Sequence, residues 1–211
     1  MCYSAESSLS SFLVGSTTSL YLLLFSNSPI YKHVGLFFIS VAFIQLLEYF
    51  MWIDQDCGII NDTASRLTVP LLSLQPIAIF LGGYMFNTTV LNKNTLYYIL
   101  LLLIIGLAHN LYKKFSDKRN YCSKPNKDGA LAWAYMEEYD FRSISTILYY
   151  SIFLTAPFIL KDKVKGMIIL AAGLSTYLYS RFPQISSHNS RWCFFASYLP
   201  ILFVILHESG L

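Results

Sequence analysis

An almost wholly apolar run, Val34 to Ile53, constrains the fold more than any other part of the chain. As a helix, this run is long enough to cross the roughly 30 Å hydrocarbon core of a bilayer. It nevertheless contains Gln45 and Glu48 one turn apart, with Trp52 a further turn along the same face. A carboxylate that faces lipid costs at least ~2.5 kcal/mol, so we expect Glu48 to face other helices or a water-filled cavity.

The low charge content assigns the whole chain to the integral membrane class. Of the 211 residues, 55% are hydrophobic and only 13% are charged. Soluble domains carry about 25% charged residues. The net charge is +3 and the basic residues lie between apolar runs, which argues against a nucleic-acid partner. Membrane lipid is therefore the partner that the composition predicts.

Apolar segments of spanning length recur along the chain and predict a seven-transmembrane-helix bundle, all-α and a single domain over 1–211. Most connections between them are short and polar. The longer loop 113–142 has mixed charge and contains Trp133, Tyr135 and Tyr139, so we expect a folded or interfacial cap. The expected spans are 6–27, 34–53, 65–86, 95–112, 143–160, 165–181 and 191–208.

An odd number of crossings places the two termini on opposite faces, here named side A (the N-terminal face) and side B. On this topology side A holds all the cysteines, namely Cys2, Cys57, Cys122 and Cys193. An exoplasmic side A would allow disulfides such as Cys57 with Cys122, whereas a cytosolic one would keep the thiols reduced. Pairing cannot be deduced from spacing alone.

The orientation of the bundle stays open at this stage. Lysine and arginine are more numerous on side A, which favours a cytosolic side A. Glu6 before the first span and Lys32 after it favour the opposite orientation. Glycosylation sequons begin at Asn61 on side A and at Asn87 on side B, so they do not decide it.

Two segments indicate an internal repeat. The run 65–77, SRLTVPLLSLQPI, aligns with the run 190–201, SRWCFFASYLPI, when one gap is allowed. Both expected helices run from side A to side B, and both carry a proline near the bilayer midplane. This pattern predicts a parallel repeat of three helices, a linker helix and three helices. The alternative is that prolines and interfacial arginines are simply common in membrane helices.

Two families share short motifs with this chain. Pro183, Gln184, Asn189 and Arg191 resemble the Pro-Gln loop of the family that includes lysosomal cystine carriers and SWEET-type carriers, although Gln75-Pro76 has the reverse order. The opening Met1-Cys2-Tyr3-Ser4-Ala5, the Gln45-x-x-Glu48-x-x-x-Trp52 element and Trp192-Cys193 resemble an uncharacterised multi-pass family of giant viruses, protists and bacteria. The second resemblance implies an integral membrane protein, of a host or virion membrane, without a known activity.

Polar residues within the spans are the candidate site. Glu48 and Gln45 lie near the side A end of their span, and His109 and Asn110 near the same end of another. Gln75 lies deeper, beside a helix break expected at Pro76, where the freed carbonyl and the amide resemble a carrier site. The functional interpretation is a solute path open to side A that narrows at Gln75. The structural interpretation is a polar clamp between Glu48 and His109.

Three function classes therefore remain open. The first is a carrier or channel for a small polar or cationic solute that uses Glu48 and Gln75. The second is an intramembrane enzyme that acts on a lipid-like substrate through Cys2, His109 or Glu48, with Cys2 as an N-terminal thiol nucleophile. The third is a structural membrane protein of a virion or organelle, and a homo-oligomer fits any of them. No cofactor is expected, and the spacing of cysteine and histidine matches no metal motif.

Overall fold

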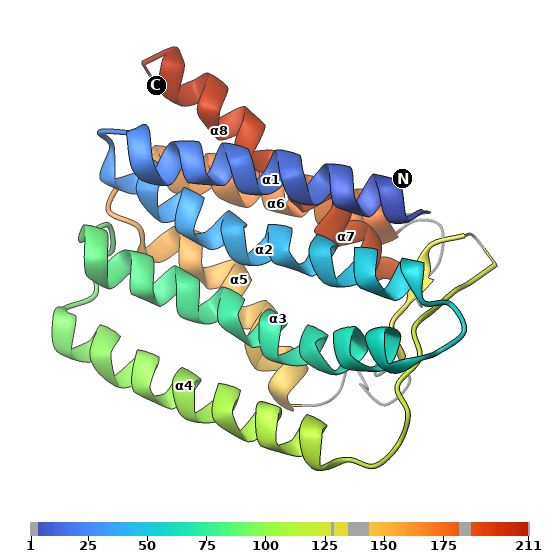
Figure 1. Cartoon of the computed structure of the whole chain (residues 1–211). Helices are drawn as coiled ribbons and strands as arrows, with labels where there is room; N and C mark the ends of the chain where they lie inside the picture. The colour runs from blue at the N-terminus through green and yellow to red at the C-terminus, as the bar shows by residue number, and fades with distance from the viewer. Residues whose placement is uncertain (1–3, 128, 135–143, 182–186, 211) are drawn as a thin grey trace.

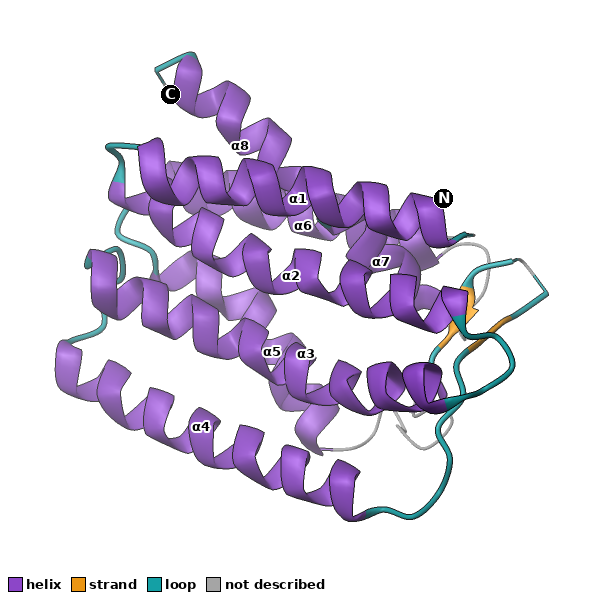
Figure 2. Cartoon of the chain, viewed as in Figure 1, coloured by secondary structure: helices purple, strands orange, loops and turns teal. Residues whose placement is uncertain are grey.

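The computed structural model describes residues 4–127, 129–134, 144–181 and 187–210. Within them the chain is all-α apart from one small hairpin, and long helices lie roughly side by side in a bundle (Figures 1 and 2). The two ends of the described chain lie at opposite ends of this bundle. The helices are α1 (Ala5–Phe25), α2 (Pro29–Ile53), α3 (Ile59–Phe86), α4 (Lys93–Ser116), α5 (Ile144–Ile159), α6 (Lys163–Arg181), α7 (His188–Ala196) and α8 (Leu199–Glu208).

Among the described residues, five helical segments are long and apolar enough to cross a membrane: α1, α2, α3, α4, and α7 taken together with α8. The apolar part of α5 is shorter. The 19 residues of α6 include Lys163, Lys165 and Arg181, which lower its apolar content. These segments fit a multi-pass membrane protein, and their number differs from the seven spans that hydropathy predicts.

Several helices extend beyond the expected boundaries. Helix α2 begins at Pro29, because a proline in the first turn has a backbone dihedral already suited to a helix and needs no N–H partner. Helix α3 begins at Ile59, where the Asp54 carboxylate accepts hydrogen bonds from the N–H groups of Gly58, Ile60 and Asn61. These N–H groups hold the pKa of Asp54 below its usual value, with Asn61 making the largest contribution.

Helix α1 packs against α2 through a stripe of small residues. Its buried positions are Ser8, Ser11, Gly15, Ser19 and Leu22, which recur every three or four residues. Small residues allow the backbones of membrane helices to approach closely. Gly35 of α2 completes this contact, since a Cβ atom there would lie 2.6 Å from the Ser19 carbonyl oxygen.

Loops on side B are tied together by backbone hydrogen bonds. The N–H of Val90 donates to the Ile159 carbonyl and that of Lys161 donates to the Thr88 carbonyl, both at 2.8 Å. Nearby, His33 Nδ1 lies 2.7 Å from the Thr88 hydroxyl oxygen, so α2 joins the same junction. The connection between α3 and α4 and that between α5 and α6 therefore meet at one end of the bundle.

The part of the long loop that the structure describes forms a cap over side A. Strand β1 (Lys124–Pro125) pairs antiparallel with β2 (Leu131–Ala132), so that Lys124 lies opposite Ala132 and Pro125 opposite Leu131. Ala130, Leu131 and Trp133 are buried, and Leu131 and Trp133 belong to the main hydrophobic core. The expected cap is thus present over 117–127 and 129–134, while Tyr135 and Tyr139 lie outside the described residues.

Candidate functional site

Glu48 lies fully buried near the side A end of α2. Gln45 Nε2 donates to one carboxylate oxygen at 2.9 Å, and the indole Nε1 of Trp133 donates to the other at 3.0 Å. The hydroxyl of Ser11 on α1 donates to Gln45 Oε1 at 2.9 Å. These four residues, here called the Glu48 cluster, join two helices and the cap in one hydrogen-bond network.

Ser190 of α7 lies beside the Glu48 carboxylate but outside hydrogen-bonding geometry. Three polar residues of this helix are buried, namely His188, Ser190 and Arg191. A third helix therefore brings a hydroxyl to the Glu48 cluster.

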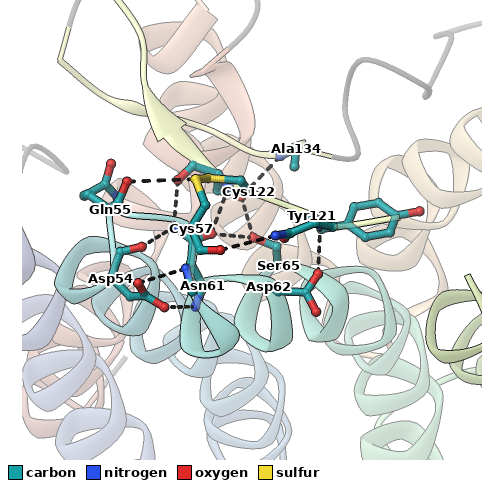
Figure 3. Close-up of a disulfide and its surroundings, with 12 residues drawn as sticks. Asp54, Gln55, Cys57, Asn61, Asp62, Ser65, Tyr121, Cys122 and Ala134 are labelled. Atoms are coloured by element: carbon teal, nitrogen blue, oxygen red, sulfur yellow. Dashed lines mark hydrogen bonds between the residues drawn. A yellow bond between two sulfur atoms is a disulfide. The ribbon is translucent and has the colours of Figure 1, made fainter. Parts of the chain in front are cut away.

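A disulfide fixes the cap to the start of α3. Cys57 and Cys122 are bonded, with their Cα atoms 5.2 Å apart and a sequence separation of 65 (Figure 3). Asn61 Nδ2 donates to the carbonyl of Ser123, whose N–H donates back to Asn61 Oδ1. The side A glycosylation sequon thus begins at a fully buried residue engaged in holding the cap.

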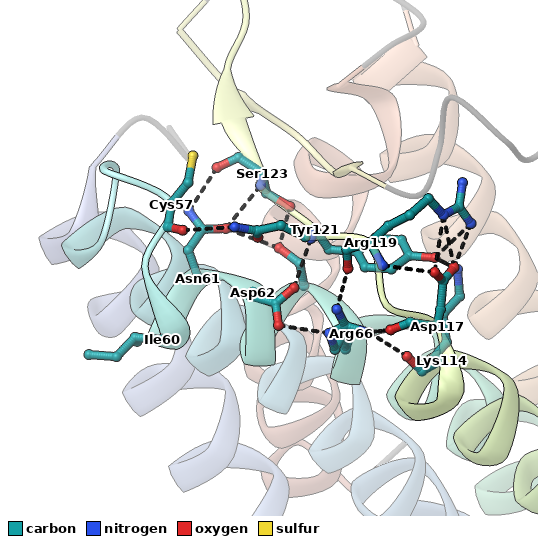
Figure 4. Close-up of polar contacts among 12 residues, drawn as sticks. Cys57, Ile60, Asn61, Asp62, Arg66, Lys114, Asp117, Arg119, Tyr121 and Ser123 are labelled. Carbon is teal, nitrogen blue, oxygen red and sulfur yellow. Dashed lines mark hydrogen bonds and ion pairs between the residues drawn. The ribbon is translucent and has the colours of Figure 1, made fainter.

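Arg66 binds the end of α4 and the loop that follows it (Figure 4). Its guanidinium donates to the carbonyls of Lys114 at 2.6 Å and Asp117 at 2.7 Å, and also to that of Arg119. Its Nε pairs with the Asp62 carboxylate at 2.7 Å. One buried cation therefore satisfies several carbonyls that a helix end leaves without partners.

Asp117 adds a charged contact at the outer edge of the cap. Its carboxylate accepts hydrogen bonds from the Arg119 guanidinium and from the Tyr121 hydroxyl. The pKa of Asp117 is held well below its usual value. The Arg119 guanidinium makes the largest contribution, and the Arg119 backbone N–H and the Tyr121 hydroxyl make smaller ones. The cap therefore has an acid-sensitive contact on its exposed side.

The predicted polar clamp between Glu48 and His109 is wrong. His109 is exposed on α4, and no hydrogen bond among the described residues joins it to Glu48. Asn110 is half-buried and donates to the Ser73 hydroxyl at 3.0 Å. Helix α4 packs against α3, so its polar residues do not reach the Glu48 cluster. The indole Nε1 of Trp52 is buried without a partner among the described residues, so it is not the donor either.

Gln75 is fully buried, but it lies far from Glu48 along the bundle. The end of α2 and the start of α3 both lie on side A. At about 1.5 Å per residue, Glu48 lies about 8 Å from the end of α2, whereas Gln75 lies about 24 Å from the start of α3. The Tyr149 hydroxyl donates to Gln75 Oε1 at 2.5 Å, and Gln75 Nε2 has no partner in the described part of the chain. The expected helix break at Pro76 is absent, because α3 continues through it.

The break occurs instead in the last span, between α7 and α8. Pro200 has no N–H to donate to the Ala196 carbonyl, and the backbone tightens locally so that Tyr198 N–H bonds to the Phe195 carbonyl at 3.2 Å. Gly15 of α1 packs against this break, where a Cβ atom would lie 2.6 Å from the Ser197 carbonyl oxygen. Because Gly15 has no side chain, α1 packs closely against this discontinuous helix.

Further buried polar atoms gather around the ring of Phe153. Tyr149 and Trp192 both contact this ring, with centroid separations of 4.7 and 5.7 Å. Gln75 Nε2 and Trp192 Nε1 are buried here without hydrogen-bond partners among the described residues. A buried unpaired donor costs about 1–3 kcal/mol, so these two nitrogens are energetically costly features of the bundle interior.

The remaining predicted site residues divide between described and undescribed parts of the chain. Cys193 is buried on α7 and is not part of the Cys57–Cys122 disulfide. Cys2, Pro183 and Gln184 lie outside the described residues. Among the residues that the structure describes, no group of three or more metal-ligating side chains converges.

Sequence reasoning missed three members of the candidate site. The sequence places Trp133 only in a folded or interfacial cap, and Ser11 is one of several serines in α1. Arg66 stands out only as a basic residue of side A and of the possible repeat. A weak signal existed for Ser11, since small residues at positions 8, 11, 15 and 19 form one helical face. Nothing in the local sequence of Trp133 indicates that it enters the bundle.

Comparisons with known proteins add no identity to this geometry. No family model, curated protein or solved structure matches the chain.

Proposed function

We propose that the chain is a multi-pass membrane carrier for a small polar or cationic solute, with Glu48 as the residue that binds it. In this proposal α5 and α6 complete seven crossings, and α4 is the linker between two three-helix repeats. The observation that carries the proposal is the fully buried Glu48 carboxylate in a network that joins α1, α2 and the cap. Ionisable residues inside membrane helices are rare and commonly mark the path of an ion or solute.

The broken last span supports the same function. Carriers commonly form their sites where a membrane helix is interrupted. Here the inward face of α7 carries Ser190 beside Glu48 and Trp192 beside Phe153, on the way to Gln75. A polar solute that left Glu48 would next meet the unpaired donors of Trp192 and Gln75.

On this proposal the described conformation is closed to side A. Glu48 is inaccessible, and the Trp133 indole covers it from the cap. Access would require Trp133 to leave the carboxylate while the disulfide retains the base of the cap. The Glu48 carboxylate would then lose its hydrogen bond from the indole N–H and bind the solute in its place. A carboxylate is suited to a cation or to a polar molecule with several hydrogen-bond donors.

A second function, a structural membrane protein, is favoured by one observation. The same Trp133–Glu48 hydrogen bond is a strong tether between the cap and the helices, and neither of the two described hollows is lined by Glu48. On this alternative the Glu48 cluster only stabilises the cap. Membership of the uncharacterised multi-pass family that the opening Met1-Cys2-Tyr3-Ser4-Ala5 resembles is also a proposal, and it is consistent with either function.

Glu48→Gln separates the two functions because the network can tolerate it. If the Gln45 amide rotates, its oxygen can accept from the new amide, and its nitrogen can donate to Ser11, whose hydroxyl then donates only to the Ser8 carbonyl. The new amide oxygen still accepts from Trp133. We therefore expect folding to be kept at a cost below about 1 kcal/mol, while the negative charge is lost.

The test is flux into proteoliposomes, measured for protons, alkali cations, and radiolabelled amines and amino acids. The proposal expects flux of at least one of these by the wild-type protein, and its loss in Glu48→Gln. Glu208→Gln is the matched control, because that carboxylate is 58% exposed and lies at the end of α8. Absence of flux for every probe, or unchanged flux in Glu48→Gln, would favour the structural alternative.

A further inference from the structure

A groove opens on side B between α2, α6 and α8, far from the Glu48 cluster. Its volume is about 290 Å³, near the lower end of the range for small-ligand sites. The interior is apolar and includes Val34, Ile168 and Phe203, whereas Tyr31, Asp162 and Lys165 line the end at the helix termini. The groove is therefore apolar towards the middle of the bundle and polar at its end, like a phospholipid.

The polar end of the groove lies on a basic segment of the chain. Three lysines and one aspartate occupy the short segment 161–165. Lys165 Nζ lies 4.8 Å from the centre of the Tyr31 ring and 3.8 Å from the Asp162 carboxylate. The ammonium groups of Lys161 and Lys163 donate to uncharged oxygens, those of Asn87 and the Phe158 carbonyl, so their charges are not neutralised by these partners.

The disulfide on the opposite side supplies the orientation. Disulfides form and persist in oxidising, exoplasmic compartments. The Cys57–Cys122 bond therefore assigns side A to the exoplasmic face and the segment 161–165 to the cytosolic face. The cytosolic leaflet carries anionic lipids, which attract lysines at the membrane surface.

We propose that the groove between α2, α6 and α8 binds one anionic phospholipid of the cytosolic leaflet. Its phosphate lies against Lys165, displacing the long contact with Asp162, and one acyl chain fills the apolar groove beside Val34 and Ile168. The Tyr31 ring supports the Lys165 side chain from below and lies at the depth of the headgroups, where tyrosine is favoured. This site is independent of the proposed solute path.

Native mass spectrometry of the whole protein released from nanodiscs tests this inference. The nanodiscs contain equal amounts of phosphatidylglycerol and phosphatidylcholine with the same acyl chains. We expect one tightly retained lipid, with phosphatidylglycerol favoured about fivefold, as expected from one lysine at the membrane surface. Lys165→Ala should reduce this preference to near parity.

Two further variants separate a built site from general attraction. Lys93→Ala is the matched control, because Lys93 is another side B lysine over a tyrosine ring, that of Tyr84 at 5.7 Å, and it does not line the groove. It should leave the preference unchanged. Ile168→Trp fills the groove without altering charge and should reduce retention of both lipids, and thermal unfolding of each variant confirms that it is folded.

Three results would overturn the inference. They are equal retention of the two lipids by the wild-type protein, an equal effect of Lys93→Ala and Lys165→Ala, and a groove that retains no lipid because a second copy of the chain covers it. The last would be recognised as a dimer mass without bound lipid.

Discussion

Replacing Trp133 with phenylalanine tests whether the cap is held to the helices through Glu48. Phenylalanine keeps an aromatic ring in a site where Trp133 is only 2% exposed, but it removes the indole N–H. The carboxylate oxygen that accepts this N–H at 3.0 Å then loses that donor. The substitution therefore isolates one hydrogen bond with only a modest loss of packing.

The expected cost follows from that geometry. A hydrogen bond to a charged group contributes about 1.5–3 kcal/mol, while polar contacts between membrane helices average about 0.6 kcal/mol. The Trp133 bond is buried and, with Glu48 ionised, charge-assisted, so we expect the value to lie near 2 kcal/mol, with roughly 1 kcal/mol more for the lost ring volume. At about 2–4 °C per kcal/mol for a chain of this size, Tm should fall by roughly 6–12 °C.

A double-mutant cycle with Glu48→Gln identifies the cause. In the Glu48→Gln background the acceptor is a neutral amide oxygen, so Trp133→Phe should cost about 1 kcal/mol less than it does in the wild-type protein. Unfolding would be followed in mixed micelles by intrinsic fluorescence of the remaining tryptophans and by proteolysis of the cap. If the two substitutions have additive effects, the hydrogen bond does not couple the cap to α2 and the reasoning is refuted.

Three further outcomes are expected. Because the pKa of Asp117 is lowered in the folded protein, its contribution to cap stability is full above its ordinary pKa of about 3.9 and is lost as the pH falls further. Protease protection of the cap should therefore drop below about pH 4, and Asp117→Asn should abolish that dependence. Gly15→Ala should lower stability by about 1–3 kcal/mol, because its Cβ would lie 2.6 Å from a backbone oxygen at the α7–α8 break, whereas Gly106→Ala, with open space around it, should leave Tm unchanged or raise it. Cys57→Ser should destabilise the protein by at most about 4 kcal/mol, the chain-entropy value for a closed loop of 65 residues, and Cys122→Ser should have the same effect; unequal losses would show that one cysteine has a role outside the bond.

Local sequence predicted the helices well, because apolar composition over about 20 residues is sufficient to specify a helix in a bilayer. The run that contains Glu48 is helical and its carboxylate is inside, as the cost of exposing a charge to lipid requires. Boundaries were less accurate. The first turn of α2 contains Tyr31, Lys32 and His33, whose polarity resembles a loop although Pro29 starts the helix there.

Tertiary structure alone decided which polar groups meet. The carboxylate of Glu48 and the indole of Trp133 are 85 residues apart in sequence, and Arg66 reaches carbonyls 48 to 53 residues away. Hydropathy is a property of each segment and carries no information about which neighbour a segment packs against. The sequence placed His109 and Glu48 at the same depth, yet α4 packs against the outer face of α3 and leaves His109 exposed.

The spans that contain Pro76 and Pro200 give the clearest example of this division. Proline removes one backbone donor in either helix, and sequence alone predicted an interruption only at Pro76. Helix α3 continues through Pro70 and Pro76, whereas the last span is interrupted before Pro200, where Gly15 allows α1 to approach the Ser197 carbonyl. A proline in the interior of a helix weakens it, but the packing of neighbouring helices determines whether the weakened turn stays helical.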